Sequence, residues 1–104
     1  MAQFCVYENK SEQSTDSIPF LLDVQADLLD SLSTRVVIPL VSGAAMGKPI
    51  KNLNPRFEIE DRAVFMSTAE LAGVPVGILG RRIVSLKDRR DEIIAAIDFL
   101  FLGF

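Results

Sequence analysis

The sequence predicts a mainly β fold that ends in one C-terminal α-helix, with the strands forming a small β-barrel on which the helix packs. Five or more short segments rich in β-branched or aromatic residues occur before residue 86, separated by turn-forming residues. The segment 86–104 instead has acidic residues near its start and apolar residues at helical spacing. A length of 104 residues fits one domain covering the whole chain.

The first half of the chain predicts three strands. Residues 3–7 form the first, in which Cys5 is expected as a packed thiol rather than a nucleophile. Residues 8–19 are polar, end at a proline and predict an exposed loop, and residues 20–25 predict the second strand. Residues 35–41 predict the third strand, which contains Pro39. Because proline has no N–H for a strand ladder, we expect an edge, a bulge or a bend there.

The second half predicts a loop, a hairpin and a bent strand. Residues 42–55 are rich in small and turn-forming residues, with a helical turn expected near Ala44–Met46. Phe57 and Ile59 alternate with charged residues, which is typical of a half-buried strand in a hairpin over 56–68 with its turn at 60–62. Residues 73–86 predict one long strand, with Gly77 and Gly80 at bends or bulges.

The C-terminal segment predicts a helix with Ser85 as N-cap, Asp88 as a weak capping-box partner, and Asp91 and Glu92 at the positive end of its dipole. A helical wheel places a core stripe on one face and Ile94 and Phe101 beside it. The stripe residues are Leu86, Ile93, Ile97, Leu100 and Phe104.

Two groups of apolar residues do not fit a single core. On the wheel, Phe99 and Leu102 fall on the side of the helix that carries acidic residues. Beside the last residues of the chain they form an apolar patch, which favours a protein contact over chance exposure. Leu28 and Leu29 are adjacent, so both cannot face one core, and we expect one of them to point outward or toward a second subunit.

Composition limits the classes of function. The net charge is -3, which argues against direct sequence-specific binding of nucleic acid and favours a protein partner. The sequence has no histidine and no recognised metal, phosphate-loop or dinucleotide motif, so no catalytic residue, metal ligand or cofactor is predicted. We read Asp61 and Arg62 as turn residues, and Arg81 and Arg82 as an exposed strand edge.

One enzymatic alternative, cleavage of RNA, remains open. Arginine with serine or threonine can cleave RNA without histidine, and the candidate pairs are Arg35 with Thr34 and Thr68 with Arg81. No signal peptide or membrane span is evident, and the single cysteine fits a reducing compartment, so a cytoplasmic location is expected.

Four segments resemble the CcdB family, the toxins of CcdA/CcdB toxin–antitoxin modules. They are "LDVQADLLD", "TRVVIPL", "GVPVGILG" and "DEIIAAIDFLFLGF", in an order and spacing that match from Phe4 to Phe104. The resemblance implies a single CcdB-like toxin domain over residues 1–104, with the SH3-like β-barrel of the CcdB/MazF toxin type. It also implies a non-enzymatic homodimer that binds the A subunit of DNA gyrase, traps the gyrase–DNA cleavage complex and is neutralised by a CcdA-like antitoxin.

The resemblance also implies where partners bind. Gyrase contact maps to Leu28, Leu29, Asp98, Phe101, Leu102, Gly103 and Phe104. The surplus of apolar residues for so small a core places Leu100, Phe101 and Phe104 at a dimer interface. The best-known family member has a tryptophan where this chain has Leu102 and an amide where it has Asp98. The alternatives are a ribonuclease toxin on the same barrel and a non-toxic CcdB-like binding module.

Overall fold

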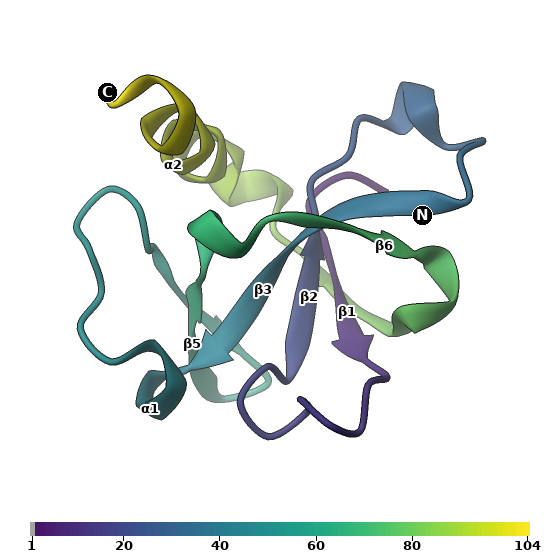
Figure 1. Cartoon of the computed structure of the whole chain (residues 1–104), viewed down its shortest axis with the longest axis horizontal. Coiled ribbons are helices and arrows are strands. Elements are labelled where there is room, and N and C mark those ends of the chain that lie inside the picture. The colour runs from purple at the N-terminus through teal and green to yellow at the C-terminus, as the bar shows by residue number, and fades with distance from the viewer. Residues whose placement is uncertain (1) are drawn as a thin grey trace.

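A computed structural model describes residues 2–104 of the chain (Figure 1). The expected fold class, mainly β with a C-terminal helix, is confirmed. The strands are β1 (Cys5–Asn9), β2 (Phe20–Asp23), β3 (Thr34–Ser42), β4 (Arg56–Ile59), β5 (Arg62–Met66), β6 (Ala72–Pro75) and β7 (Leu79–Ser85). The helices are α1 (Gly43–Met46) and α2 (Arg90–Leu102), and short 3-10 turns are η1 (Asp27–Leu29), η2 (Thr68–Glu70), η3 (Val76–Ile78) and η4 (Lys87–Arg89).

The strands form one curled antiparallel sheet around β3. The order is β4-β5-β3-β2-β1-β7, and β6 also pairs with β3. One edge of β3 pairs with β2, while the other pairs first with β6 over residues 34–37 and then with β5 over residues 40–42. Pro39 lies between these two partners, opposite Leu21 of β2. Proline cannot donate a hydrogen bond to a neighbouring strand, and here it occupies the position at which β3 changes partner from β6 to β5.

The hairpin forms as expected, but the long strand over 73–86 does not. Glu60 and Asp61 both have positive φ, 50° and 63°, as a tight hairpin turn requires, and Arg62 already belongs to β5. The expected single strand is instead β6 and β7, separated by η3. The reason is topological: β6 pairs with β3 and β7 pairs with β1, and β2 lies between those two partners.

Gly80 lies at a bulge, as expected. Along β1 the pairing moves from Tyr7↔Arg82 to Asn9↔Leu79, so β7 uses one more residue than β1 over this step. A Cβ at Gly80 would lie 3.2 Å from the carbonyl oxygen of Glu8. Glycine therefore favours the close approach of the two strands, because a Cβ would require its neighbours to shift.

The core lies between the curled sheet and α2. Alternate residues of β1 point to opposite sides: Val6 joins the main cluster, while Cys5 and Tyr7 join a smaller one on the other face. Cys5 is buried, which confirms the packed thiol. Helix α2 covers the main cluster with Ile93 and Ala96, both fully buried. Within residues 2–104, no helix combines the length and apolar character needed to cross a bilayer.

The start of α2 differs from the expectation. Ser85 is the last residue of β7, and its hydroxyl accepts a hydrogen bond from the Lys87 N–H at 3.2 Å, so it serves η4 and does not cap α2. Helix α2 begins only at Arg90, with Asp91 and Glu92 in its first turn as expected. The guanidinium of Arg89 lies 4.6 Å from the centre of the Phe57 ring and 2.6 Å from the Glu92 carboxylate. Arg89 therefore links the first turn of α2 to β4.

Candidate partner-binding surfaces

The C-terminal end of α2 exposes apolar side chains. Phe101, Leu102 and Phe104 are 67%, 60% and 86% exposed. We call these three residues the helix tip. The expectation that Phe104 belongs to the core stripe is wrong, because Gly103 has φ 80° and ψ 10° and turns the chain out of the helix. The Gly103 N–H donates to the Phe99 carbonyl at 3.0 Å and closes the last turn.

The buried face of α2 is shifted from the predicted stripe. Leu86, which precedes the helix, and Ile97 pack against the main core cluster, as expected, and Leu100 is half-buried. Phe99 was expected to point outward, but it is half-buried, so that expectation is wrong. The reason is that the buried face of α2 is centred between Ile93 and Ala96. Alanine is small and only weakly hydrophobic, so the helical wheel did not count Ala96 as part of the predicted stripe.

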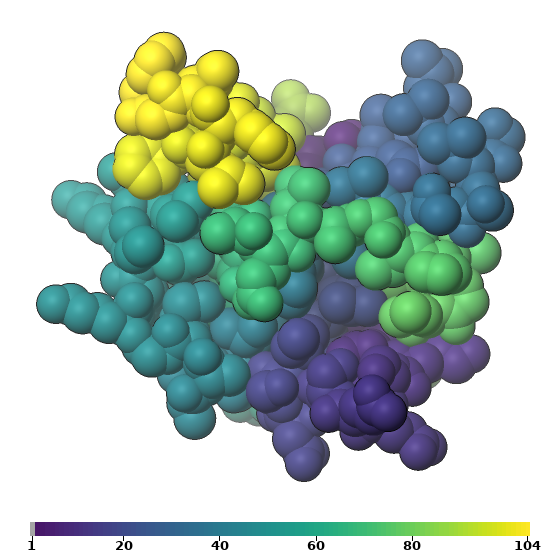
Figure 2. Space-filling view, viewed as in Figure 1, coloured from purple at the N-terminus to yellow at the C-terminus, as the bar shows by residue number. Residues whose placement is uncertain are grey.

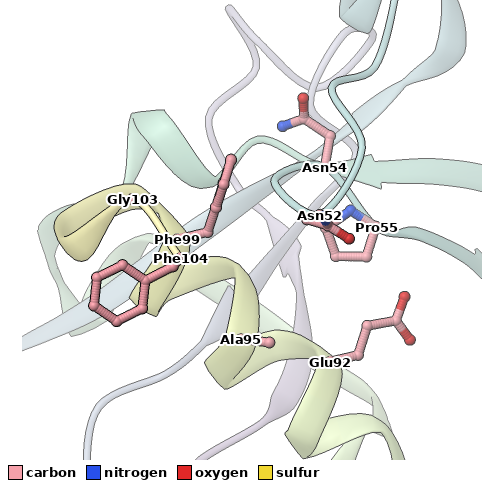
Figure 3. A pocket seen from close by; sticks show the side chains of 8 residues that line it. All are labelled: Asn52, Asn54, Pro55, Glu92, Ala95, Phe99, Gly103 and Phe104. Atoms are coloured by element: carbon pink, nitrogen blue, oxygen red, sulfur yellow. The ribbon is translucent and has the colours of Figure 1, made fainter.

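A groove runs beside the helix tip. It has a volume of about 500 Å³ and lies between α2 and the segment 52–55 (Figure 3). Ala95, Phe99 and Phe104 provide its apolar side, and Asn52, Asn54 and Pro55 face them. The Asn54 side chain is fixed by hydrogen bonds to the Ile50 N–H and the Met66 carbonyl, at 2.9 and 3.0 Å. The wall opposite the helix is therefore held by β5.

The second apolar group lies on the segment 26–34, all of which is exposed. We call this segment the η1 loop. Leu28 is 94% exposed and Leu29 is 49% exposed, so both side chains point out of the core, where we expected one of them to point outward or toward a second subunit. A leucine that is 94% exposed gains almost nothing from the fold of this chain, which favours contact with another chain.

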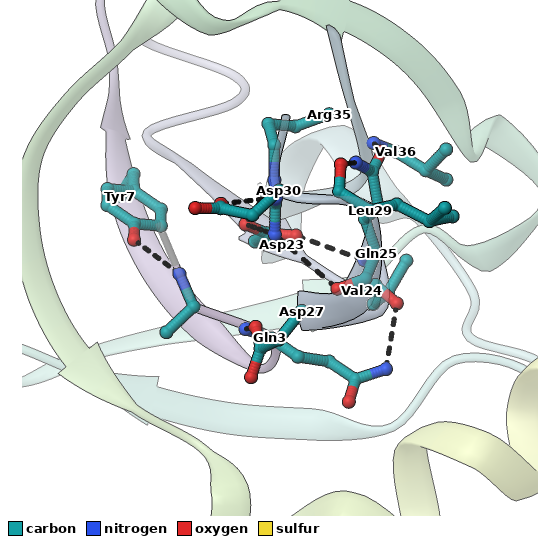
Figure 4. Close-up of polar contacts among 11 residues, drawn as sticks. Gln3, Tyr7, Asp23, Val24, Gln25, Asp27, Leu29, Asp30, Arg35 and Val36 are labelled. Carbon is teal, nitrogen blue, oxygen red and sulfur yellow. Dashed lines mark hydrogen bonds and ion pairs between the residues drawn. The ribbon is translucent and has the colours of Figure 1, made fainter. Parts of the chain in front are cut away.

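A buried ion pair stabilises the position of the η1 loop. Arg35 is 1% exposed and Asp23 is fully buried, and the Arg35 Nη2 lies 2.7 Å from the Asp23 Oδ2. The Nε donates to the same oxygen at 2.9 Å, and Nη1 reaches Asp30 at 3.0 Å (Figure 4). Burial raises the pKa of the Asp23 carboxyl, while the hydrogen bond from Arg35 opposes that rise.

Gln25 extends this network to both sides. Its backbone N–H donates to Asp23, its side-chain oxygen accepts from the Val36 N–H, and its side-chain nitrogen donates to the Leu29 carbonyl, at 3.0, 2.9 and 3.0 Å (Figure 4). Sequence reasoning treated Asp23 and Gln25 as ordinary strand residues and did not foresee this role. The sequence does place Asp23 and Gln25 in one predicted strand and Arg35 at the start of the next. Polar side chains in strands need hydrogen-bond partners when they are buried, and this was the signal for the network.

One subunit does not bring the two apolar groups together. In Figures 1 and 2 the helix tip lies at the upper left and the η1 loop at the upper right, with other parts of the chain between them. Asp98 is exposed on α2, and Leu100 is half-buried. The residues predicted to contact gyrase therefore form two separate surfaces of the chain.

The proposed ribonuclease pairs are not arranged for catalysis. Arg35 is buried in its ion pairs and cannot reach a phosphate beside Thr34. The Thr68 hydroxyl is fully buried and donates to the Leu53 carbonyl. Arg81 is exposed and lies near Glu8 and Glu60, at 3.6 and 3.4 Å.

The fold and these surfaces define a small β domain that presents apolar side chains at the helix tip and on the separate η1 loop, which polar contacts hold in place. The family model described as "CcdB protein" matches residues 3–103, and the chain therefore belongs to the CcdB family. Membership in this family supports assigning the chain to the toxins of toxin–antitoxin modules.

Proposed function

We propose that this chain is the toxin of a type II toxin–antitoxin module that binds the A subunit of DNA gyrase and traps the gyrase–DNA cleavage complex. The observation that carries the proposal is the exposed apolar helix tip in a CcdB-family chain. Burying a phenylalanine or leucine side chain contributes about 1.5–3 kcal/mol, so the tip can supply much of a binding energy. The proposed toxin acts as a non-enzymatic binder.

The proposed gyrase contact uses both apolar surfaces. It consists of Leu28 and Leu29 on the η1 loop, and Asp98, Phe101, Leu102, Gly103 and Phe104 on α2 and its end. Leu102 provides a smaller contact area than the tryptophan of the best-known member. The exposed carboxylate of Asp98 requires a cation or water in the complex, because an unpaired buried charge is costly.

The proposal includes a homodimer and an antitoxin. Leu100, Phe101 and Phe104 are placed near a two-fold axis, where one patch serves both subunits. The antitoxin is a CcdA-like protein whose acidic or mixed amphipathic segment covers Leu28, Leu29 and the helix end. Such a segment is disordered when free, and its ordering offsets part of the binding energy.

The gyrase proposal is tested by incubating the purified protein with gyrase and supercoiled plasmid. We expect linear DNA after denaturation of gyrase, dependent on both the protein and gyrase. Cleavage of RNA by the purified protein alone, without gyrase-dependent breaks, would establish the ribonuclease alternative instead.

The placement of the antitoxin is tested with Leu29→Glu, because Leu29 is exposed and the change should not disturb the core. We expect binding of the cognate antitoxin to weaken strongly, with Val84→Glu as a control at an apolar site on β7 of comparable exposure, 42%. Unchanged affinity of Leu29→Glu would show that the antitoxin binds elsewhere.

A further inference from the structure

Positive charge is concentrated at the junction of β7 and α2. Residues 81–90 contain Arg81, Arg82, Lys87, Arg89 and Arg90, five of the 11 basic residues of the chain, and only one acidic residue, Asp88. Their net charge is +4, so the rest of the chain carries −7 to give the total of −3. A basic cluster on an acidic chain is a local feature that the overall composition conceals.

The basic residues of this cluster differ in their partners. Arg81 lies near Glu8 and Glu60, and Arg89 pairs with Glu92. Arg82 and Lys87 have no ion pair with any residue of the described chain, 2–104, and Arg90 has only a distant neighbour, Asp91, at 3.9 Å. These three cations line one pocket of about 350 Å³, with Phe4 and Cys5 also in its lining. Unpaired cations that converge on a concave site favour a ligand with negative charge.

A second pocket continues this one along α2. It has a volume of about 470 Å³ and shares Gln3, Phe4 and Arg90 with the first. Its remaining lining residues are Ile94 and Ala95, which are apolar, and the carboxylates Asp91 and Asp98. The two pockets form one groove with a basic end at Arg82 and Lys87, an apolar middle, and an acidic end at Asp98. We call it the polar-ended groove.

The wall at Phe4 is fixed by the backbone. Phe4 has φ 68°, a value that bulky residues rarely adopt. Its N–H donates to the Asp23 carbonyl at 2.6 Å, and its carbonyl accepts from the Leu86 N–H at 2.7 Å. These two bonds hold Phe4 between β2 and the start of η4, so the groove is preformed and a ligand does not have to order it.

We propose that the polar-ended groove binds a peptide segment of a partner protein. The segment places carboxylates against Arg82, Lys87 and Arg90, an apolar side chain against Ile94 and Ala95, and a basic side chain against Asp91 or Asp98. A nucleic-acid strand fits less well, because its uniform negative charge would be repelled by the acidic end and by Asp27, which also lines the basic pocket. Charge complementarity along the groove therefore selects a segment of mixed charge.

This site is separate from the proposed gyrase and antitoxin contacts. Only Asp98 is common to both, and Arg82, Lys87 and Arg90 belong to neither the helix tip nor the pair Leu28 and Leu29. A variant at the basic end thus tests the groove without altering the residues on which the gyrase proposal depends.

The test measures binding of a fluorescent synthetic peptide with a block of glutamates, a central pair of leucines and a block of lysines. We expect saturable binding by the full chain and amide NMR shifts at residues 82, 87, 90 and 94. The double variant Arg82→Gln/Lys87→Gln should weaken binding about tenfold, as expected for the loss of two exposed ion pairs. Added salt should weaken binding by the unsubstituted chain more than by the double variant.

The matched control is Arg81→Gln, because Arg81 is the neighbouring exposed arginine but does not line the groove. It should leave peptide affinity nearly unchanged, and all variants should unfold at similar temperatures. Absence of saturable binding, or equal loss in Arg81→Gln and the double variant, would overturn the proposal. Preference for a DNA oligonucleotide or for an all-glutamate peptide would refute a mixed-charge peptide as the ligand. A change of oligomeric state in the double variant without loss of peptide affinity would show a subunit contact instead.

Discussion

Gly103 determines where the last side chains of the molecule point. Its positive φ ends α2 at Leu102 and directs Phe104 away from the sheet. A Cβ at this position would meet no atom within 4 Å, so space around the glycine is not the constraint. The requirement is conformational, since residues with a Cβ adopt this region at a cost of about 1–2 kcal/mol.

Leu102→Glu should remove gyrase binding while leaving the fold intact. Leu102 is 60% exposed, and surface substitutions usually change the free energy of unfolding by less than about 0.5 kcal/mol. Truncation of a residue at the centre of an interface can cost about 2 kcal/mol or more. The measurements are thermal unfolding, affinity for the gyrase A subunit and inhibition of growth.

Val84→Glu is the control for Leu102→Glu, because it adds the same charge at an exposed apolar site on β7, which belongs to neither proposed gyrase surface. It should retain gyrase binding. If Leu102→Glu unfolded several degrees lower and still bound gyrase, Leu102 would be a structural residue. Deletion of the exposed Phe104 should likewise leave stability of the subunit nearly unchanged.

Gly103→Ala should lower the free energy of unfolding by about 1 kcal/mol, because alanine is strained at positive φ. Gly103→Asn should lose less, since asparagine tolerates this region better. Urea denaturation of the three proteins measures the difference. Equal stability of glycine and alanine proteins would mean that the chain end refolds into a regular helical turn.

At the scale of elements, the junction of β2 and β3 carries the η1 loop. Arg35 at the start of β3 binds Asp23 at the end of β2, and Gln25 joins Val36 to Leu29. The loop has no buried side chain from residue 26 to residue 34, so its position depends on these polar contacts and on the bond from the Gln3 N–H to Asp27 at 2.8 Å. The presentation of Leu28 and Leu29 is therefore coupled to the sheet through Arg35, which reaches Asp30, and through Gln25, which bonds Leu29 directly.

Asp23→Ala should destabilise the protein by about 3–5 kcal/mol, because it leaves the buried Arg35 guanidinium without its main partner. Asp30→Ala is the matched comparison: it removes a carboxylate from the same arginine, but at a side chain that is 58% exposed. We expect it to cost less than about 1 kcal/mol. Chemical denaturation measures both. Similar losses in the two variants would show that burial of the Asp23 pair does not control the stability of this junction.

For the whole molecule, the separation of the helix tip from the η1 loop bears on assembly. The chain presents two apolar surfaces at different ends of one side, and the side chains of both are exposed (Figure 2). A domain of this size buries only about 60–65% of the surface of its unfolded chain, so pairing of exposed apolar patches adds stability that the small core lacks. A two-fold contact through the helix ends would cover part of the tip.

The protein should therefore sediment as a homodimer at micromolar concentration, and its unfolding temperature should rise with protein concentration. Phe101→Glu should shift the equilibrium toward monomer, because Phe101 is 67% exposed and the charge would be buried in the contact. Val84→Glu should remain dimeric. A wild-type monomer over this concentration range would contradict the proposed interface of Leu100, Phe101 and Phe104.

Local sequence patterns were enough to predict the class of the fold, the positions of most elements and the two groups of apolar residues that fit no single core. Alternation at Phe57 and Ile59, the proline in β3 and the acidic start of α2 are local signals, since each depends on residues within a few positions along the chain. The adjacent pair Leu28 and Leu29 was recognised for the same reason. These features needed no knowledge of which strands become neighbours.

The remaining features depend on neighbours that are distant in sequence, and they became evident in the folded chain. Residues 73–86 divide into β6 and β7 because they pair with β3 and β1, and Pro39 is accommodated where β3 changes partner. Asp23 and Arg35, which form the buried ion pair, are 12 positions apart in the sequence. Arg81 and Arg82 are adjacent, but Arg81 lies near Glu8 whereas Arg82 lines a pocket. At Gly103 a single backbone rotation overrides the wheel and exposes Phe104. Periodicity describes one element at a time, whereas burial and charge pairing are set by the whole fold.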